Sequence, residues 1–137
     1  MAVLVDTGVF VSAADTHEPG HEACAELLRA HRGEMVVPAP VVAETAWLIE
    51  SRLGPTAEAR FLALITTDDV AVVDLSIADY QRCITLIATY ADMGLGVVDS
   101  SVVTVAENLK LTTIATLNRR DFRVVRPAHC DAFELIP

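Results

Sequence analysis

Basic residues are scarce in this chain. Ten lysines and arginines stand against 19 aspartates and glutamates, which gives a formal net charge of -9. A protein that holds nucleic acid by bulk charge needs many lysines and arginines to contact phosphates, so the composition argues against that class. If a nucleic acid is nevertheless the substrate, the attraction must be local or must depend on a metal ion.

Cysteines, aromatic residues and long apolar runs are also few. The three cysteines are widely spaced and form no CxxC pair, which argues against a disulfide framework and against a zinc-thiolate site. No apolar run is long enough to cross a membrane, and the N-terminus lacks the basic start of a signal peptide. We therefore expect a cytoplasmic protein with buried cysteines. Aromatic residues make up only 5% of the chain, and we expect four of them in the core: Phe10, Trp47, Phe61 and Phe122. Trp47 could instead lie at a surface that contacts another protein chain.

Hydrophobic residues are abundant, at 53% of 137 residues, which is enough to form the core of one domain over residues 1–137. Short apolar segments alternate with segments of helical periodicity. This alternation predicts parallel βαβ units and a three-layer α/β/α domain around a central, mainly parallel sheet of four to five strands. We expect strands at 3–5, 35–37, 70–73, 111–116 and 133–136, and helices at 8–14, 21–32, 41–53, 56–64, 77–90 and 95–108.

The chain opens with a short apolar run that ends at Asp6. A buried parallel strand of this kind places Asp6 at its carboxyl end, where open α/β sheets bind their ligands. Asp6 could equally cap the helix that begins near Gly8. The first strand alone does not decide between the two roles.

Two further carboxylates lie in apolar surroundings. Glu44 and Asp99 have only apolar residues or glycine three and four positions away on their expected helices. A charged carboxylate in such a place is costly unless it is paired or bound to a metal ion. The simpler alternatives are a Glu44 that reaches a backbone amide or a core arginine, and an Asp99 that caps its helix. By contrast, Asp79 and Glu107 each have a basic residue three positions on, and we expect them to form solvated surface pairs.

A fourth carboxylate, Asp121, follows the expected strand at 111–116 after a turn that contains Asn118, although it could also be an ordinary turn residue. Asp6, Glu44, Asp99 and Asp121 can therefore converge at one end of the sheet. Carboxylates gathered there would repel each other unless divalent cations neutralised them. Oxygen ligands without cysteine or histidine favour Mg²⁺ or Mn²⁺ over Zn²⁺. This arrangement suits a metal-dependent phosphodiesterase.

Four segments of the chain resemble, in order and spacing, the signature segments of PIN-domain nucleases, and in particular of VapC-type toxins from bacterial toxin-antitoxin systems. The resemblance covers essentially the whole chain. Each segment is short and weak by itself, and the signal comes from having all four in register. The segments are Val3-Leu4-Val5-Asp6-Thr7-Gly8, Val42-Ala43-Glu44, Gly96-Val97-Val98-Asp99-Ser100-Ser101 and Thr116-Leu117-Asn118-Arg119-Arg120-Asp121-Phe122.

The resemblance implies an endoribonuclease that depends on Mg²⁺ or Mn²⁺, with one or two ions in each active site. It also implies a homodimer that is held inactive by a cognate VapB-type antitoxin. Members of the family cut structured RNAs, including tRNA and the sarcin-ricin loop of ribosomal RNA. Asp6, Glu44 and Asp99 match the three core acidic positions of the family.

The fourth acidic position is divided between two residues. Many relatives carry Asp where this chain has Asn118, whereas others have Asn there and Asp three residues later, as at Asp121. We assign the role to Asp121, with Asn118 as a polar helper. Thr7 resembles the hydroxyl residue that follows the first aspartate and orients a carboxylate or water. Ser101 is expected to support the site from the start of the Asp99 helix.

Arginines are concentrated beside Asp121, where Arg119, Arg120, Arg123 and Arg126 fall within one short segment. A local basic rim of this kind could hold an RNA backbone next to the acidic centre. A solvated turn explains the same charges nearly as well.

Two other functions are compatible with the sequence. One is a catalytically silent PIN-like module that only binds protein or RNA, and the other is a housekeeping nuclease that processes RNA. The presence of all the core acidic residues favours an enzyme over the silent module. The small size and the absence of further domains favour the toxin over the processing nuclease.

Overall fold

Five short strands form one parallel sheet in the computed structural model of the chain, which describes residues 1–137. The strand order is β3-β2-β1-β4-β5, and every neighbouring pair is parallel. The strands are β1 (Val3–Val5), β2 (Met35–Pro38), β3 (Val70–Val73), β4 (Thr113–Ala115) and β5 (Glu134–Ile136). The predicted parallel sheet is therefore confirmed, with five strands.

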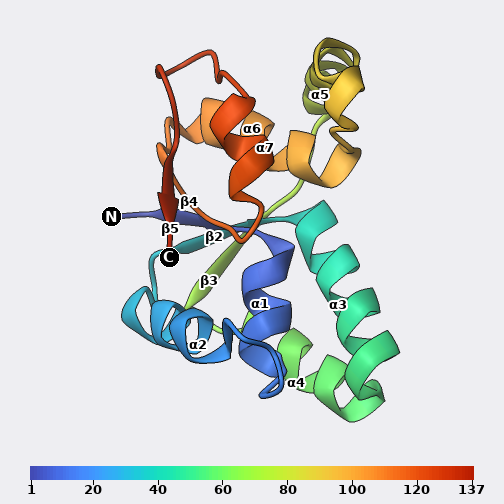
Figure 1. Cartoon of the computed structure of the whole chain (residues 1–137), viewed down its shortest axis with the longest axis vertical. Coiled ribbons are helices and arrows are strands. Elements are labelled where there is room, and N and C mark those ends of the chain that lie inside the picture. Colours follow the sequence, from blue (N-terminus) through green and yellow to red (C-terminus); the bar gives the residue numbers. More distant parts are fainter.

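Helices cover both faces of this sheet (Figure 1). Four helices lie on one side of it: α1 (Thr7–Ala14), α2 (His21–Ala30), α3 (Ala39–Leu53) and α4 (Pro55–Ile65). The other side carries α5 (Ile77–Thr89), a 3-10 turn η1 (Ala91–Met93), α6 (Val97–Leu109) and α7 (Arg119–Val124). The predicted three-layer α/β/α architecture is confirmed, and the predicted strands and helices agree with the structure to within two residues at each end.

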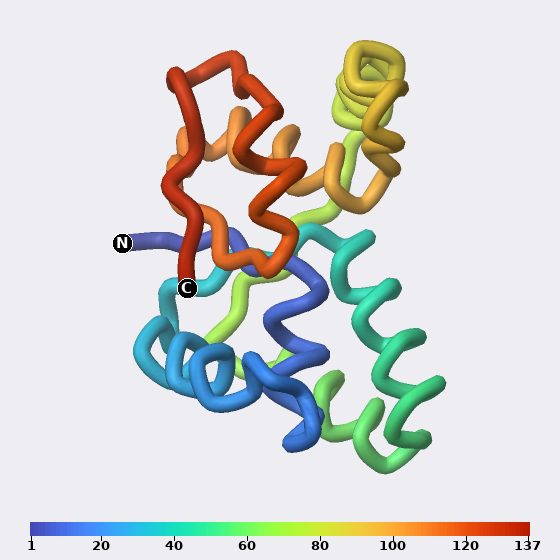
Figure 2. Tube along the Cα trace, in the orientation of Figure 1, coloured from blue at the N-terminus to red at the C-terminus, as the bar shows by residue number.

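The centre of the sheet is the most buried part of the molecule. All three residues of β1 are fully buried, and Leu4 pairs with Val36 on one side and Ile114 on the other. The chain begins in the middle of the sheet, with the first strand drawn in blue in Figure 2. Its red C-terminal segment returns to the sheet and pairs with β4. The strand order reverses between β1 and β4, and open α/β sheets form their ligand crevice at such a point, at the carboxyl ends of the strands.

One predicted turn is wrong. The segment after β4 was expected to be a turn up to Asp121, but Arg119–Val124 forms helix α7. Phe122 of α7 and Val125, which follows the helix, are both buried, so this segment packs apolar side chains inward. The four arginines around these two residues conceal this apolar pattern in the sequence.

The expected core is confirmed with one exception among the aromatic residues. Phe10, Phe61 and Phe122 are buried, whereas 66% of Trp47 is exposed. The buried line of α3 runs through Val41, Thr45 and Ile49, four residues apart, and Trp47 lies off that line. Cys24 and Cys83 are buried and Cys130 is partly exposed, and all three are free thiols. None of the helices combines the length and apolarity that a membrane span requires.

Candidate metal-binding active site

The register of the sheet brings Asp6 next to Thr116. Val5 pairs with Ala115, so the residues that follow these two leave the sheet side by side. The Asp6 amide donates a hydrogen bond to the Ala115 carbonyl over 2.9 Å, which extends the ladder by one step. Asp6 is thus fixed by backbone pairing at the carboxyl end of the central strand, as predicted.

Both carboxylate oxygens of Asp6 accept hydrogen bonds. Oδ1 accepts from the Thr7 amide over 2.8 Å, and Oδ2 accepts from the Thr116 hydroxyl over 2.8 Å. The first bond makes Asp6 the N-cap of α1, so capping and a role in the site are compatible. Burial raises the pKa of Asp6, the two hydrogen bonds oppose that rise, and the charge of Glu44 adds to it.

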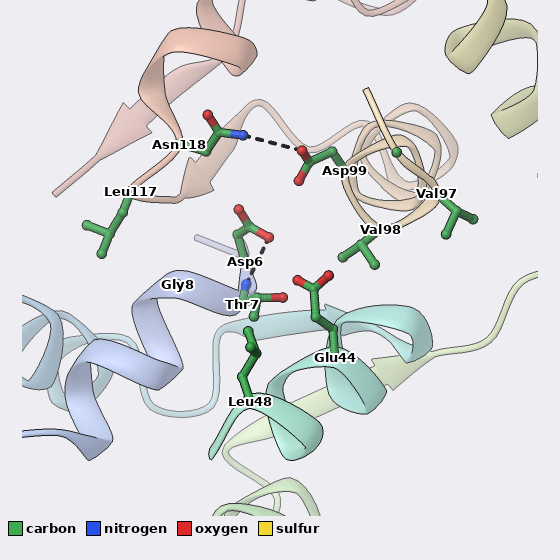
Figure 3. A pocket seen from close by; sticks show the side chains of 11 residues that line it. Asp6, Thr7, Gly8, Glu44, Leu48, Val97, Val98, Asp99, Leu117 and Asn118 are labelled. Carbon is green, nitrogen blue, oxygen red and sulfur yellow. Dashed lines mark hydrogen bonds between the residues drawn. The ribbon is translucent and has the colours of Figure 1, made fainter. Parts of the chain in front are cut away.

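Asp6, Glu44 and Asp99 share one open cavity of about 660 Å³. Glu44 reaches it from α3 and Asp99 from the first turn of α6, and Figure 3 shows the three carboxylates directed toward the same space. The N-cap of α6 is Gly96, so the alternative in which Asp99 caps this helix is wrong. The cavity is lined by Asp6, Thr7, Gly8, Glu44, Leu48, Gly96, Val97, Val98, Asp99, Leu117 and Asn118.

These three carboxylates have no cationic partner. None of the ion pairs in the structure includes Asp6, Glu44 or Asp99. Burial, together with the negative charges of Asp6, Asp121 and Glu44, raises the pKa of Asp99 to about 7. The three carboxylates therefore gather negative charge in one open cavity. Keeping them ionised there is costly without a cation.

The fourth position is occupied by Asn118, with Asp121 behind it. Asn118 lines the cavity, and its Nδ2 donates to Asp99 Oδ2 over 3.3 Å and to Asp121 Oδ2 over 3.0 Å. Asp121 is not part of the cavity lining, and its other oxygen lies 3.4 Å from Nε of Arg120. In this conformation Asp121 therefore contacts the site through Asn118 and adds negative charge near Asp99.

The two predicted hydroxyl residues differ in position. Thr7 lines the cavity, and its buried Oγ1 has no hydrogen-bond partner. Ser101 is fully buried, and its hydroxyl donates to the Val98 carbonyl over 2.6 Å. Thr7 thus contributes an unsatisfied oxygen to the site, whereas Ser101 satisfies its own helix and does not line the cavity.

Thr116 opens the fourth signature segment, but the sequence did not reveal its role in the site. Its hydroxyl donates to Asp6 Oδ2 and accepts from the Asn118 amide over 2.9 Å. The segment 111–116 was expected to be strand throughout, which concealed Thr116 as a strand residue. The signal that could have found it is register, because it is the residue of the neighbouring strand that stands opposite Asp6.

Two of the four clustered arginines are engaged with the backbone. Arg119 donates to the carbonyls of Leu135 and Pro137, over 3.3 and 2.6 Å, and Arg126 donates to the Arg123 carbonyl over 2.6 Å. Arg120 has a side chain that is 85% exposed, and Arg123 is also exposed. Arg120 and Arg123 are therefore the two arginines of this cluster that are exposed and not bound to the backbone.

The donor set fits a hard divalent cation. The cavity offers carboxylate, hydroxyl and amide oxygens and no cysteine or histidine, which favours Mg²⁺ or Mn²⁺. No three acidic, histidine or cysteine side chains converge closely enough to hold an ion as they now stand. The Thr7 hydroxyl, which has no hydrogen-bond partner, is a further oxygen donor in the lining. The residues fit such an ion by the chemistry of their donor atoms.

Three solved structures share this fold. VapC20 from Mycobacterium tuberculosis, described as a sarcin-ricin loop cleaving toxin, superposes with a TM-score of 0.77 at 16% identity over 82% of this chain and 87% of that one. VapBC2 from Rickettsia felis, bound to a DNA fragment from its promoter, gives 0.70 at 16% identity over 100% of both chains. FitAcB from Neisseria gonorrhoeae gives 0.59 at 16% identity over 98% of this chain and 96% of that one.

Sequence comparison agrees with the fold. Ribonuclease VapC26 from Mycobacterium tuberculosis is 29% identical over 135 residues, which covers 98% of this chain and 100% of the relative. The family model described as PIN domain matches residues 3–126, a span that includes every acidic residue of the cavity. The chain belongs to the PIN domain family.

Proposed function

We propose that this protein is a VapC-type toxin, a Mg²⁺- or Mn²⁺-dependent endoribonuclease that cleaves structured RNA such as tRNA or ribosomal RNA. The observation that carries the proposal is that three carboxylates from separate elements share one cavity without any cationic partner. The similarity to ribonuclease VapC26, and the fold shared with a toxin that cleaves the sarcin-ricin loop, support this choice of activity and substrate class.

Asp6, Glu44 and Asp99 are the side chains that would hold one or two ions, with Asn118 and Asp121 beside them. When bound, such ions polarise a scissile phosphate, activate water and stabilise the leaving oxygen. The side chains themselves bind and orient. Asp6 is the most rigid of them, because both of its oxygens are already hydrogen bonded to fixed groups. The side-chain amide of Asn118 positions Asp99 by donating a hydrogen bond to its Oδ2.

The substrate side of the site combines an open cavity with a short basic rim. A cavity of about 660 Å³ is large enough for a phosphodiester and part of a nucleotide. Arg120 and Arg123, on α7, are exposed beside Asp121 and can contact neighbouring phosphates. Arg120 and Arg123 would thus attract the RNA backbone locally, although the whole chain has a net charge of -9.

The proposal includes two protein partners, a second copy of this chain and a VapB-type antitoxin. Helix α5 exposes a single line of large apolar side chains, which a second copy could cover. The fold shared with VapBC2 and FitAcB supports the antitoxin. The exposed residues on α5 are Ile77 (75%), Tyr80 (47%), Ile84 (67%) and Ile87 (37%).

The test is cleavage of total RNA by the purified protein and by Asp6→Asn, with Mn²⁺, Mg²⁺ or chelator present. We expect discrete RNA fragments with either ion and none with chelator. Loss of a ligand that supports several kcal/mol of charge stabilisation should lower the cleavage rate by at least about a hundredfold. Asp68→Asn is the matched control, because Asp68 is exposed and precedes β3, at the opposite end of the sheet.

Growth after induced expression gives an independent measurement. The wild type and Asp68→Asn should arrest growth, whereas Asp6→Asn should not. Equal toxicity of all three proteins would contradict the metal-nuclease mechanism. RNA that is bound but never cut, with either ion present, would favour the silent binding module instead.

A further inference from the structure

The Thr116 hydroxyl links the two halves of the candidate site. It is fully buried, and it stands between Asp6 and the segment that carries Asn118. Its backbone is fixed as well, because the Thr116 amide donates to the Ile136 carbonyl of β5 over 2.8 Å. Hydrogen bonds therefore hold both the backbone and the hydroxyl of Thr116 in place relative to the sheet.

The direction of its hydrogen bonds follows from counting protons. A hydroxyl has one proton, and Thr116 Oγ1 already accepts the amide proton of Asn118, so its own proton goes to Asp6 Oδ2. The Thr7 amide donates to the other oxygen. Both oxygens of Asp6 are thus held as acceptors, and the rotation of this carboxylate is fixed.

The same hydroxyl sets the position of Asn118. The backbone amide of Asn118 donates to the Thr116 hydroxyl, and its side-chain amide donates to Asp99 and Asp121. A continuous chain of hydrogen bonds therefore runs from Asp6 through Thr116 and Asn118 to the other carboxylates. Without the hydroxyl, Asp6 loses one fixed contact and the Asn118 segment loses its anchor.

We propose that Thr116 is a positioning residue that orients Asp6 for a divalent cation and aligns Asn118 with it through one buried hydroxyl. This inference rests on the proposed metal-dependent function. Groups that orient metal ligands in this way commonly contribute 10–100-fold to metal affinity or activity.

The test compares Thr116→Val, which keeps the shape and removes the hydroxyl, with Thr116→Ser, which keeps the hydroxyl. Mn²⁺ affinity is measured without RNA, by electron paramagnetic resonance of the free ion. We expect Thr116→Val to bind Mn²⁺ roughly 10–100-fold more weakly, and Thr116→Ser to stay within a few fold of wild type. In RNA cleavage, kcat should fall with KM for RNA unchanged, and added Mn²⁺ should partly restore the rate.

Thr104→Val is the matched control. Thr104 is also buried, but its hydroxyl donates to the Ser100 carbonyl within α6, so Mn²⁺ affinity should not change. Thr116→Ala replaces Thr116→Val if the latter does not fold. Unchanged Mn²⁺ binding in the variant without the hydroxyl, or equal losses in the Val and Ser variants, would overturn the positioning role. If the wild-type protein itself binds no Mn²⁺, the proposed function fails and this inference fails with it.

Discussion

Helix α6 carries an acidic residue near each end, and only one of the two has a cationic partner. Asp99 lies in the first turn, without a cationic partner, beside two other carboxylates. Glu107 lies in the last turns of the same helix, buried, and accepts two hydrogen bonds from Arg82, over 2.8 and 2.9 Å. It also accepts from the Ala128 amide over 2.7 Å. One helix therefore holds both a compensated and an uncompensated carboxylate.

The difference between Glu107 and Asp99 shows how a carboxylate that stabilises the fold can be distinguished from one that is available to a ligand. Glu107 joins α5, α6 and the segment after α7, and every one of its oxygens has a donor. Burial alone would raise its pKa, but the Arg82 and Ala128 contacts outweigh burial and lower it. At Asp99 burial and neighbouring negative charges act together, and one side-chain amide opposes them. A carboxylate left without charge compensation in a folded protein is a candidate ligand for something else.

The largest expected effect is an opposite change in stability when each acid is replaced by its amide. Glu107→Gln breaks a partly buried ion pair and should cost about 2 kcal/mol, or roughly 8 °C in melting temperature. Asp99→Asn removes an uncompensated charge and should raise the melting temperature by a few degrees. Thermal unfolding of both variants in chelator at neutral pH measures the difference.

Activity should separate the same two variants in the other direction. Glu107→Gln, kept well below its melting temperature, should retain cleavage and Mn²⁺ binding, because Glu107 lies outside the cavity lining. Asp99→Asn should lose both. If the amide at Asp99 also destabilises the protein, then Asp99 is a structural acid like Glu107 and the contrast between them is wrong.

The sequence predicted much of the fold and the cavity, because both follow from short-range patterns. Apolar runs and helical periodicity specify the strands and helices, and parallel strands place their carboxyl ends together. The apolar helical neighbours of Glu44 and Asp99 correctly singled them out, and both line the cavity with Asp6.

What the sequence concealed depends on contacts between distant segments. Glu107 was expected to form a solvated pair with Lys110, but its partner is Arg82, 25 residues away on α5. Asp79 was likewise expected to pair with Arg82, whereas it closes a capping box with Ser76 and accepts from Asn108. A spacing of three residues permits such pairs but does not select them over a partner brought by tertiary packing. Thr116 was missed for the same reason, since only sheet register places it beside Asp6.

A second, smaller effect concerns pH. The pKa of Asp99 is raised in the folded protein from 3.8 to about 7, so the folded state binds this proton more tightly than the unfolded state. Its contribution to stability is therefore present at low pH and is lost as pH rises from about 4 to 7. Relative to Asp99→Asn, the melting temperature of the wild type in chelator should therefore fall over this range. Asp6, whose pKa is also raised, contributes in the same direction in both proteins, so the comparison isolates Asp99.

Added Mn²⁺ sharpens this test. A cation that binds the ionised carboxylates should raise the melting temperature of the wild type more at pH 8 than at pH 5, because fewer protons must be displaced. The stabilisation should be absent in Asp99→Asn. If the difference in melting temperature between the wild type and Asp99→Asn in chelator does not change from pH 4 to pH 7, Asp99 is ionised without cost, which contradicts the uncompensated site.

The smallest expected effect concerns the arginines, which repeat the contrast between the two acids. Arg82 is bound to Glu107 and Arg119 to the carbonyls of the C-terminal segment, whereas Arg120 and Arg123 are exposed on α7. Charge reversal at Arg119 would therefore also disturb β5, so Arg120→Ala with Arg123→Ala is the cleaner test. Losing two phosphate contacts should raise KM for RNA several-fold, leave kcat unchanged and reduce the slope of the salt dependence of binding by roughly 1.4–1.8.

The control for the arginine pair removes the same two charges elsewhere. Arg29→Ala with Arg32→Ala changes exposed residues at the end of α2, near the start of β2 and thus at the opposite end of the sheet from the cavity. If the two double variants lower RNA affinity equally, the effect is one of overall charge and there is no basic rim. If only the Arg120 and Arg123 variant does, these two side chains supply the local attraction that a chain with a net charge of -9 needs to bring RNA to its acidic centre.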